Sequence, residues 1–202
     1  MNYLRRYFLR MNWLAHLYLS EPTAAFRIGN LLPDLAPASV LSAMLPEFRR
    51  GMARHRRIDA FTDRNPIFRQ SLARIEAPYR RYGGILVDVF YDHFLARDWP
   101  SFSSQPLPAF VSEVYASFEP LRAEIPPLAY HRLEQMRSGD WLNSYGDLKG
   151  ISVTLTRMAA RFSRPTPIAD GVTVLEEHYE SFHSDFMTFF PELVVHVATH
   201  PD

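Results

Sequence analysis

The chain has 202 residues, of which 47% are hydrophobic and 14% aromatic, and its formal net charge is zero. This is enough apolar material for the core of one domain. The absence of cysteine excludes disulfides, thiolate metal sites and cysteine nucleophiles. Any metal must therefore bind His, Asp, Glu or water, ligands that favour Mn²⁺, Mg²⁺, Fe²⁺ or a His-rich Zn²⁺ site.

Neither a membrane segment nor an export signal is evident. No run reaches the roughly 18 apolar residues of a membrane span. The N-terminal apolar stretch follows arginines, but no small-residue cleavage site comes after it. We therefore expect a cytoplasmic protein without a membrane contact.

Charge is distributed unevenly along the chain. Residues 1–97 have fifteen Arg and eight acidic residues, residues 98–164 have seven charges of each sign, and residues 165–202 have seven acidic residues and no Lys or Arg. This balance disfavours a nucleic-acid-binding protein and is compatible with an acidic partner that meets one face.

Helical periodicity recurs along the chain, and no segment alternates with the period of a strand. Apolar stripes with helical spacing occupy three segments, at 83–97, 147–162 and 173–190. Proline and glycine predict breaks near 33–37, 78–84, 100–108, 126–127 and 165–171. We predict a single all-α domain of about eight to ten helices over residues 11–202. Residues 1–10 are interpreted as an N-terminal extension, because Met11 can serve as a start.

Histidine and aspartate stand among apolar residues in four segments of the first half. His16 lies in an apolar helix start, and is either a hydrogen-bonded core histidine or a ligand. Asp34 follows two leucines and a proline at a helix end, where it is either a cap or a ligand.

The third segment is the most basic part of the chain. His55, Asp59 and Asp63 are spaced i, i+4 and i+8, so one helix presents an imidazole and two carboxylates in a row. The two acids repel each other unless a cation or an arginine neutralises them. Five arginines fall in nine residues, namely Arg49, Arg50, Arg54, Arg56 and Arg57. They either bind phosphate or an acidic protein, or form a solvated face.

The fourth segment places acids on an apolar helix. Asp88 and Asp92 are one turn apart within 83–97, where an ionised acid is costly unless it is paired or bound to a metal. His93 is about 100° around the helix from Asp92, which is close enough to share a site. We interpret these residues as functional.

In these four segments the sequence resembles the acyl carrier protein phosphodiesterases. The matching segments are MNWLAHLYLS at 11–20, GNLLPD at 29–34, HRRIDAFTD at 55–63 and DVFYDHFLARDW at 88–99. The resemblance implies an all-helical bundle similar to HD-domain phosphohydrolases. It implies hydrolysis, by metal-activated water, of the phosphodiester between 4′-phosphopantetheine and a serine of holo-acyl carrier protein. It also implies a divalent cation, usually Mn²⁺, with Mg²⁺ and Fe²⁺ as alternatives.

The resemblance implies a role for each candidate residue. The predicted metal ligands are Asp34, His55, Asp92 and His93, with His16 as a further candidate. The predicted catalytic residues are Asp59 and Asp88, as ligand or general base, and His93, which together with His16 is a candidate acid for the leaving group. The predicted substrate-binding residues are Arg54, Arg56 and Arg57, which would hold the diester or the acidic carrier protein.

Two other functions fit the same residues. An HD-like nucleotide phosphohydrolase, or another phosphodiesterase, would use a similar site with the arginines on nucleotide phosphates. A non-catalytic helical protein that binds an acidic partner would have structural His and Asp segments and no stoichiometric metal.

Overall fold

The structure is a computed structural model that describes residues 13–200. Within this part every regular element is a helix, and none is a strand. The predicted all-α fold is therefore confirmed. The predicted N-terminal extension, residues 1–10, lies outside the described residues.

The described part contains twelve α-helices and four short 3-10 helices. Eight α-helices have eight or more residues: α2 (Ala24–Leu35), α4 (Pro46–Arg64), α5 (Pro66–Ala73), α6 (Gly83–Arg97), α7 (Leu107–Ala116), α8 (Pro127–Ser138), α10 (Leu148–Ala159) and α12 (Tyr179–Thr199). The shorter ones are α1 (Trp13–Tyr18), α3 (Ala38–Leu41), α9 (Trp141–Ser144) and α11 (Val172–Glu177). The 3-10 helices are η2 (Arg80–Tyr82), η3 (Trp99–Ser101), η4 (Glu119–Leu121) and η5 (Pro167–Asp170). The long helices match the predicted number, and the short ones raise the total.

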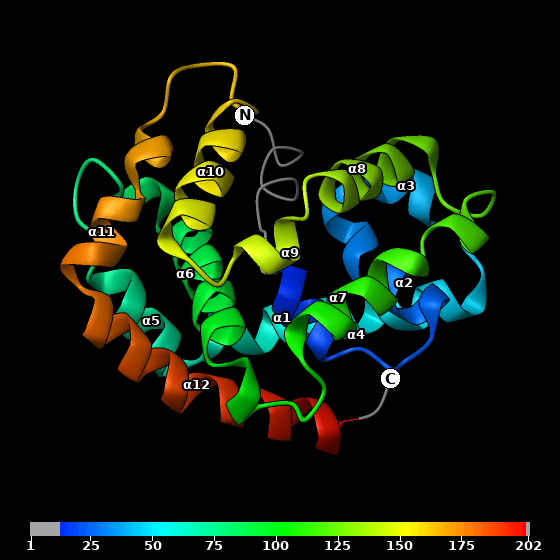
Figure 1. The fold of residues 1–202 in the computed structure, drawn as a ribbon, viewed down its shortest axis with the longest axis horizontal. Helices are drawn as coiled ribbons and strands as arrows, with labels where there is room; N and C mark the ends of the chain where they lie inside the picture. Colours follow the sequence, from blue (N-terminus) through cyan, green and yellow to red (C-terminus); the bar gives the residue numbers. More distant parts are fainter. Residues whose placement is uncertain (1–12, 201–202) are drawn as a thin grey trace.

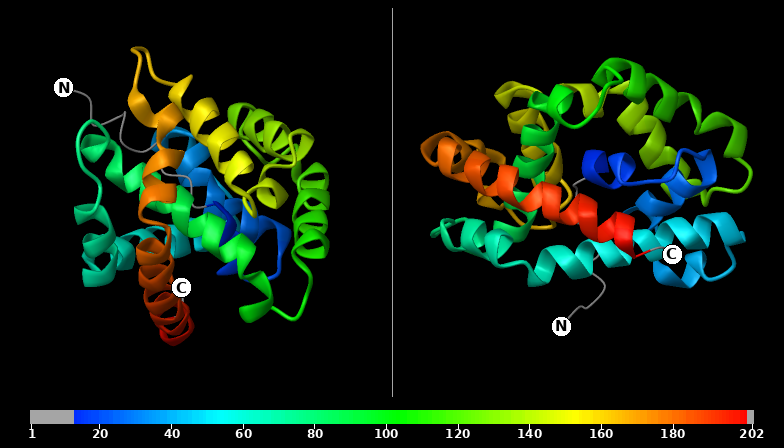
Figure 2. Two further views of the ribbon diagram at one scale, coloured as in Figure 1. Left: turned by 60° about the vertical axis from the view of Figure 1, so that its left-hand side comes forward. Right: turned by 90° about the horizontal axis from the view of Figure 1, so that it is seen from below.

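The short helix α1 lies in the middle of the molecule. Figure 1 shows α5, α6, α10 and α11 on one side of it and α2, α3, α7 and α8 on the other. α1 contacts α2 and α6, and α12 packs across α4, α5 and α6. The two further views agree with this central position (Figure 2). Side chains of α1 can therefore meet those of several longer helices.

Two glycines bring α2 and α4 into backbone contact. A Cβ on Gly29 would overlap the backbone of Phe48, and a Cβ on Gly51 would overlap the carbonyl oxygen of Phe26. Larger residues would push the helices apart. This close approach places Asn30 of α2 beside His55 of α4.

Two helix ends differ in detail from the sequence expectation. The break predicted near 33–37 falls at Ala36, so Pro33 lies inside α2 and Asp34 belongs to its last turn. The stripe predicted over 173–190 is divided at His178, between α11 and α12. Proline near the end of a helix removes a single backbone hydrogen bond, which the packing of α2 tolerates.

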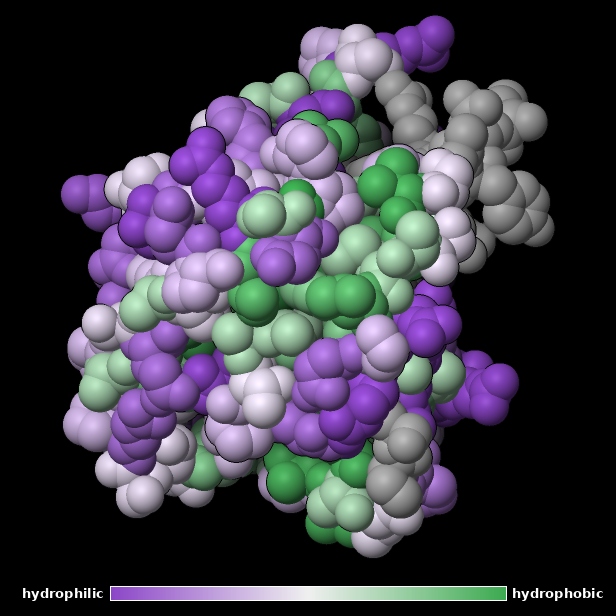
Figure 3. All heavy atoms as spheres, turned by 90° about the vertical axis from the view of Figure 1, so that its right-hand side faces the viewer, coloured by the Kyte–Doolittle hydropathy of each residue, from purple (hydrophilic) through white to green (hydrophobic). Residues whose placement is uncertain are grey.

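The described surface is mixed in character. Figure 3 shows one face, on which hydrophobic side chains near the centre are interspersed with hydrophilic ones. Among the described helices, none is long and apolar enough to cross a membrane.

Candidate metal centre

Three predicted residues from α1 and α4 meet in the middle of the molecule. His16, His55 and Asp59 each offer a ligand atom, and these atoms lie within 4.8 Å of one another. The His16 and His55 rings stack with their centroids 4.2 Å apart. The i, i+4 spacing on α4 thus places an imidazole and a carboxylate on the same face, as the sequence predicted.

Asp34 adds a second carboxylate. The distance from His55 Nε2 to Asp34 Oδ1 is 3.7 Å, and that from His55 Nε2 to Asp59 Oδ2 is 3.5 Å. His16 Nε2 lies 3.6 Å from Asp59 Oδ1. These separations are long for hydrogen bonds. They are close to the ~3–3.6 Å that separates two neighbouring ligand atoms of one divalent ion.

Asn30 orients both imidazoles. Its Nδ2 donates to the carbonyl oxygen of His16 and to Ser20 Oγ, at 2.7 Å and 2.9 Å. Its Oδ1 is therefore the acceptor for His16 Nδ1 at 2.9 Å. The backbone oxygen of Asn30 accepts from His55 Nδ1 at 2.7 Å. Both Nδ1 atoms thus carry the proton, and both Nε2 lone pairs face the carboxylates.

A lone pair that faces a carboxylate oxygen is repelled by it unless a cation or a proton lies between them. His16 Nε2 is buried and has no hydrogen-bond partner among the described residues. An unpartnered buried polar atom is costly, and hydrogen bonds at Nδ1 are typical of metal-ligating histidine. The donor set of two imidazoles and two carboxylates fits a divalent transition metal such as Mn²⁺ or Fe²⁺, or Zn²⁺.

The group opens to solvent on one side. The His16, His55 and Asp34 side chains are at most 5% exposed, whereas Asp59 is 25% exposed. Of these four side chains, that of Asp59 is therefore the one most accessible to solvent.

The structure does not bring Asp92 into this group. Its two carboxylate oxygens accept from the backbone N–H groups of Leu14 and Ala15, each at 2.9 Å. Asp92 therefore caps the start of α1, the helix that carries His16. Burial raises the pKa of Asp92, whereas the two backbone hydrogen bonds oppose this rise. The buried acid is thus compensated by backbone donors, an arrangement that the sequence interpretation did not consider.

His93 and Asp88 also lie outside the group. His93 Nδ1 is 2.8 Å from the carbonyl oxygen of Tyr145, and Nε2 is 2.8 Å from the Tyr179 hydroxyl. Both ring nitrogens are thus engaged, and burial lowers the His93 pKa, which does not suit a protonated acid for the leaving group. Asp88 is buried on α6, one turn before Asp92.

The predicted arginines point in different directions. Arg54 is buried, donates to the carbonyl oxygen of Leu19 at 2.8 Å and lies over the Phe26 ring. Arg56 is exposed. Arg57 is about 200° around α4 from His55 and donates to the carbonyl oxygen of His200.

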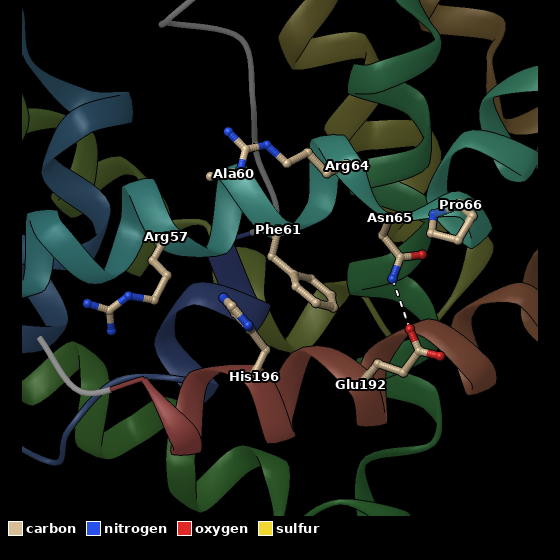
Figure 4. A pocket seen from close by; sticks show the side chains of 8 residues that line it. All are labelled: Arg57, Ala60, Phe61, Arg64, Asn65, Pro66, Glu192 and His196. Carbon is tan, nitrogen blue, oxygen red and sulfur yellow. Dashed lines mark hydrogen bonds between the residues drawn. The ribbon is translucent and has the colours of Figure 1, made fainter.

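Arg57 lines a separate pocket on the other side of α4. The pocket lies between α4 and α12 and has a volume of about 450 Å³. Figure 4 shows the Phe61 and His196 rings facing each other at its centre, and the hydrogen bond between Asn65 and Glu192 at one end. Since this pocket faces away from His55, Arg57 does not belong to the metal group.

Sequence reasoning missed two residues that position the group. Asn30 belongs to the quoted GNLLPD segment, and the available signal was an amide inside an apolar run. Trp13 Nε1 donates to Asp34 Oδ2 at 3.2 Å. Its hydrogen-bonding role had no signal in the sequence, because an indole in an apolar segment is typical of any core.

Comparison with known proteins gives a consistent result. A family model described as acyl carrier protein phosphodiesterase matches residues 11–193. The chain is 33% identical to an acyl carrier protein phosphodiesterase of Salmonella agona (strain SL483) over 189 residues, which are 93% of this chain and 98% of that protein. It is also 33% identical to the protein of the same name from Enterobacter sp. (strain 638), over 92% of this chain and 96% of that one. No solved structure matches the chain.

Proposed function

Because this chain belongs to the acyl carrier protein phosphodiesterase family, we propose that it hydrolyses the phosphodiester linking 4′-phosphopantetheine to holo-acyl carrier protein at the group formed by His16, Asp34, His55 and Asp59. The products are apo-acyl carrier protein and 4′-phosphopantetheine. We also propose a cytoplasmic location on the basis of this substrate.

The observation that carries the proposal is the orientation of the two histidines. Their Nδ1 atoms are held by Asn30, and their Nε2 atoms face Asp59 at 3.5–3.6 Å. His16, Asp34 and His55 would hold a divalent cation from the buried side, with Asp59 on the open side. A bound cation supplies Lewis-acid chemistry, because it lowers the pKa of water and offsets charge on phosphoryl oxygens.

Asp59 has a second task in this proposal. Its carboxylate is the most exposed of the four side chains, so it is the one that meets the attacking water. It orients this water and accepts its proton as the water oxygen bonds to phosphorus. The bond from phosphorus to the serine oxygen then breaks, and the serine oxygen takes up a proton from solvent. Asp88 has no role at the reacting atoms in this proposal.

Arg56 and Arg49 are the exposed arginines that we assign to carrier docking. Arg56 is three residues before Asp59 on α4, so the two are neighbours on the helix surface. Arg49 is two turns earlier on the same face. Acyl carrier proteins are strongly acidic, and an exposed basic face beside the opening would steer them to the site. Charge reversal at Arg56 should weaken turnover of the carrier protein and leave hydrolysis of a small diester nearly intact.

The direct test follows the carrier protein by mass spectrometry. Purified protein is incubated with holo-acyl carrier protein and Mn²⁺, with or without EDTA. The proposal predicts loss of the phosphopantetheine mass, and EDTA should abolish this loss. An unchanged carrier protein in the presence of bound Mn²⁺ would reject the substrate.

A further inference from the structure

Trp13 connects Asp34 to helices outside the metal group. It is the first residue of α1, and its side chain is buried. Its Nε1 donates to Asp34 Oδ2 at 3.2 Å. An indole N–H can only donate, so a buried one requires an acceptor such as this carboxylate. The orientation of the indole is therefore tied to that of a predicted metal ligand.

The hydrogen bond from Trp13 distinguishes the two oxygens of Asp34. Oδ2 accepts from Trp13, whereas Oδ1 lies 3.7 Å from His55 Nε2. Asp59 differs, because its Oδ1 faces His16 Nε2 and its Oδ2 faces His55 Nε2. The Asp34 oxygen that Trp13 engages is thus not the one that lies beside the imidazole.

The Trp13 indole is itself held by a stack of side chains. It packs on Trp141 of α9, with ring centroids 5.8 Å apart and an interplanar angle of 7°. A Cβ on Gly139 would overlap the Trp141 indole, so this indole lies directly against the end of α8. The Arg157 guanidinium of α10 is 5.0 Å from the centroid of the Trp141 ring. These contacts confine Trp141, and through the stack they confine Trp13.

The backbone of Asp34 is fixed independently of its side chain. Arg132 of α8 donates from Nη1 to the carbonyl oxygens of Leu35 and Asp34, at 3.1 Å and 3.4 Å. This contact holds the last turn of α2, but an aspartate carboxylate can still rotate about its terminal bond. The hydrogen bond from the Trp13 N–H restrains this rotation.

We propose that Trp13 is a positioning residue that makes Asp34 bind the cation through Oδ1 alone. The inference rests on the metal group of the proposed function and gives the buried stack a role in it. A hydrogen bond to a ligating carboxylate fixes its orientation. A carboxylate that binds through one oxygen occupies one position around the ion instead of two, and catalytic metal sites keep a position for water or substrate.

The test measures Mn²⁺ affinity by calorimetry for Trp13→Phe, which keeps an aromatic ring in the stack and removes the N–H. The matched control is Trp99→Phe. Trp99 is also buried, and its Nε1 donates to the carbonyl oxygen of Gln105 at 2.7 Å. Each variant loses one indole hydrogen bond, and only that of Trp13 involves a predicted metal ligand. Urea unfolding in EDTA gives the stability of each protein without bound metal.

We expect Trp13→Phe to bind Mn²⁺ about 10–100-fold more weakly than the parent protein. Trp99→Phe should bind Mn²⁺ as the parent does, although the urea midpoints of both variants should fall to a similar extent. Parental Mn²⁺ affinity in Trp13→Phe, or an equal loss of affinity in Trp99→Phe, would overturn the inference. A parent protein that binds no Mn²⁺ would overturn it as well.

A second measurement uses the parent protein and decides the matter if Trp13→Phe does not fold. The chain has three tryptophans, whose indole N–H signals in an NMR spectrum can be assigned with Trp99→Phe and Trp141→Phe. Diamagnetic Zn²⁺ should shift the Trp13 signal, because the cation withdraws electron density from the carboxylate that accepts this hydrogen bond. The Trp99 signal should stay in place. An unmoved Trp13 signal at saturating Zn²⁺ would overturn the inference.

Neither measurement involves the carrier protein. A Mn²⁺ affinity that depends on Trp13, without release of phosphopantetheine from holo-acyl carrier protein, would reject the proposed function and leave the positioning role standing. Release of phosphopantetheine by the parent, together with parental Mn²⁺ affinity in Trp13→Phe, would reject the positioning role alone.

Discussion

Replacing Asn30 by Ala should weaken the metal centre and the fold together. The Asn30 side chain makes three hydrogen bonds, to His16 Nδ1, to the His16 carbonyl oxygen and to Ser20 Oγ. Each buried hydrogen bond contributes about 1 kcal/mol, so the free energy of unfolding should fall by about 3 kcal/mol. Loss of the hydrogen bond that orients a ligating histidine should also weaken Mn²⁺ binding by about 10–100-fold.

Asn65→Ala is a matched control for this change. Asn65 is also buried and makes three side-chain hydrogen bonds, with the N–H groups of Ile67 and Phe68 and with Glu192. It lies just after the end of α4, in the wall of the pocket (Figure 4). Its loss should cost a similar free energy of unfolding and leave Mn²⁺ affinity unchanged.

The assay has two parts. Urea unfolding in EDTA gives the stability of each variant without a contribution from bound metal, and calorimetric titration gives the Mn²⁺ affinity. If Asn30→Ala binds Mn²⁺ as tightly as the parent, or no more weakly than Asn65→Ala, Asn30 does not orient the ligands and the account of the centre fails.

Three further predictions test the helix contact, the helix cap and the buried histidine that surround the candidate metal centre. Gly51→Ala should lower the free energy of unfolding by about 1–3 kcal/mol, because the added Cβ would overlap Phe26. Gly84→Ala should not lower it, because a Cβ there meets no atom within 4 Å. Equal urea midpoints for the two variants would contradict the close contact between α2 and α4. Asp92→Ala should cost about 1–2 kcal/mol through the lost cap of α1, and an unchanged midpoint would show that the cap is dispensable. Burial lowers the pKa of His93 from 6.5, so the unfolded chain takes up a proton at His93 at a higher pH than the folded chain does. The stabilisation by neutral His93 is therefore complete above pH 6.5 and is lost as the pH falls below that value. The parent protein should therefore lose stability on acidification more steeply than His93→Gln, and parallel profiles would refute this.

Local patterns in the sequence predicted those features that depend on residues close to one another in the same helix. The i, i+4 spacing of His55 and Asp59 placed both on the same face, and the all-α class followed from the apolar stripes. The motifs also nominated His16 and Asp34, although each taken alone is more typical of a core or capping role.

What depends on contacts between helices was not predictable from these patterns. Asp92 was correctly recognised as a buried acid that needs a partner, but its donors are backbone N–H groups of α1, 77 and 78 residues earlier in the chain. The same limit applies to Arg132, whose contact with the end of α2 spans 97 residues. Helical periodicity gives the direction of a side chain on its own helix, and does not give which helix lies opposite.

The measurement that tests the central claim most directly compares Asp59→Asn with Asp63→Asn. Both remove one negative charge from α4, and Asp63 is the exposed acid one turn beyond Asp59. Release of phosphopantetheine from holo-acyl carrier protein is followed by mass spectrometry at saturating Mn²⁺. The account predicts that Asp59→Asn slows release by at least about 100-fold, as expected for loss of a general base, while Asp63→Asn stays near the parental rate. Parental turnover by a folded Asp59→Asn protein would contradict it.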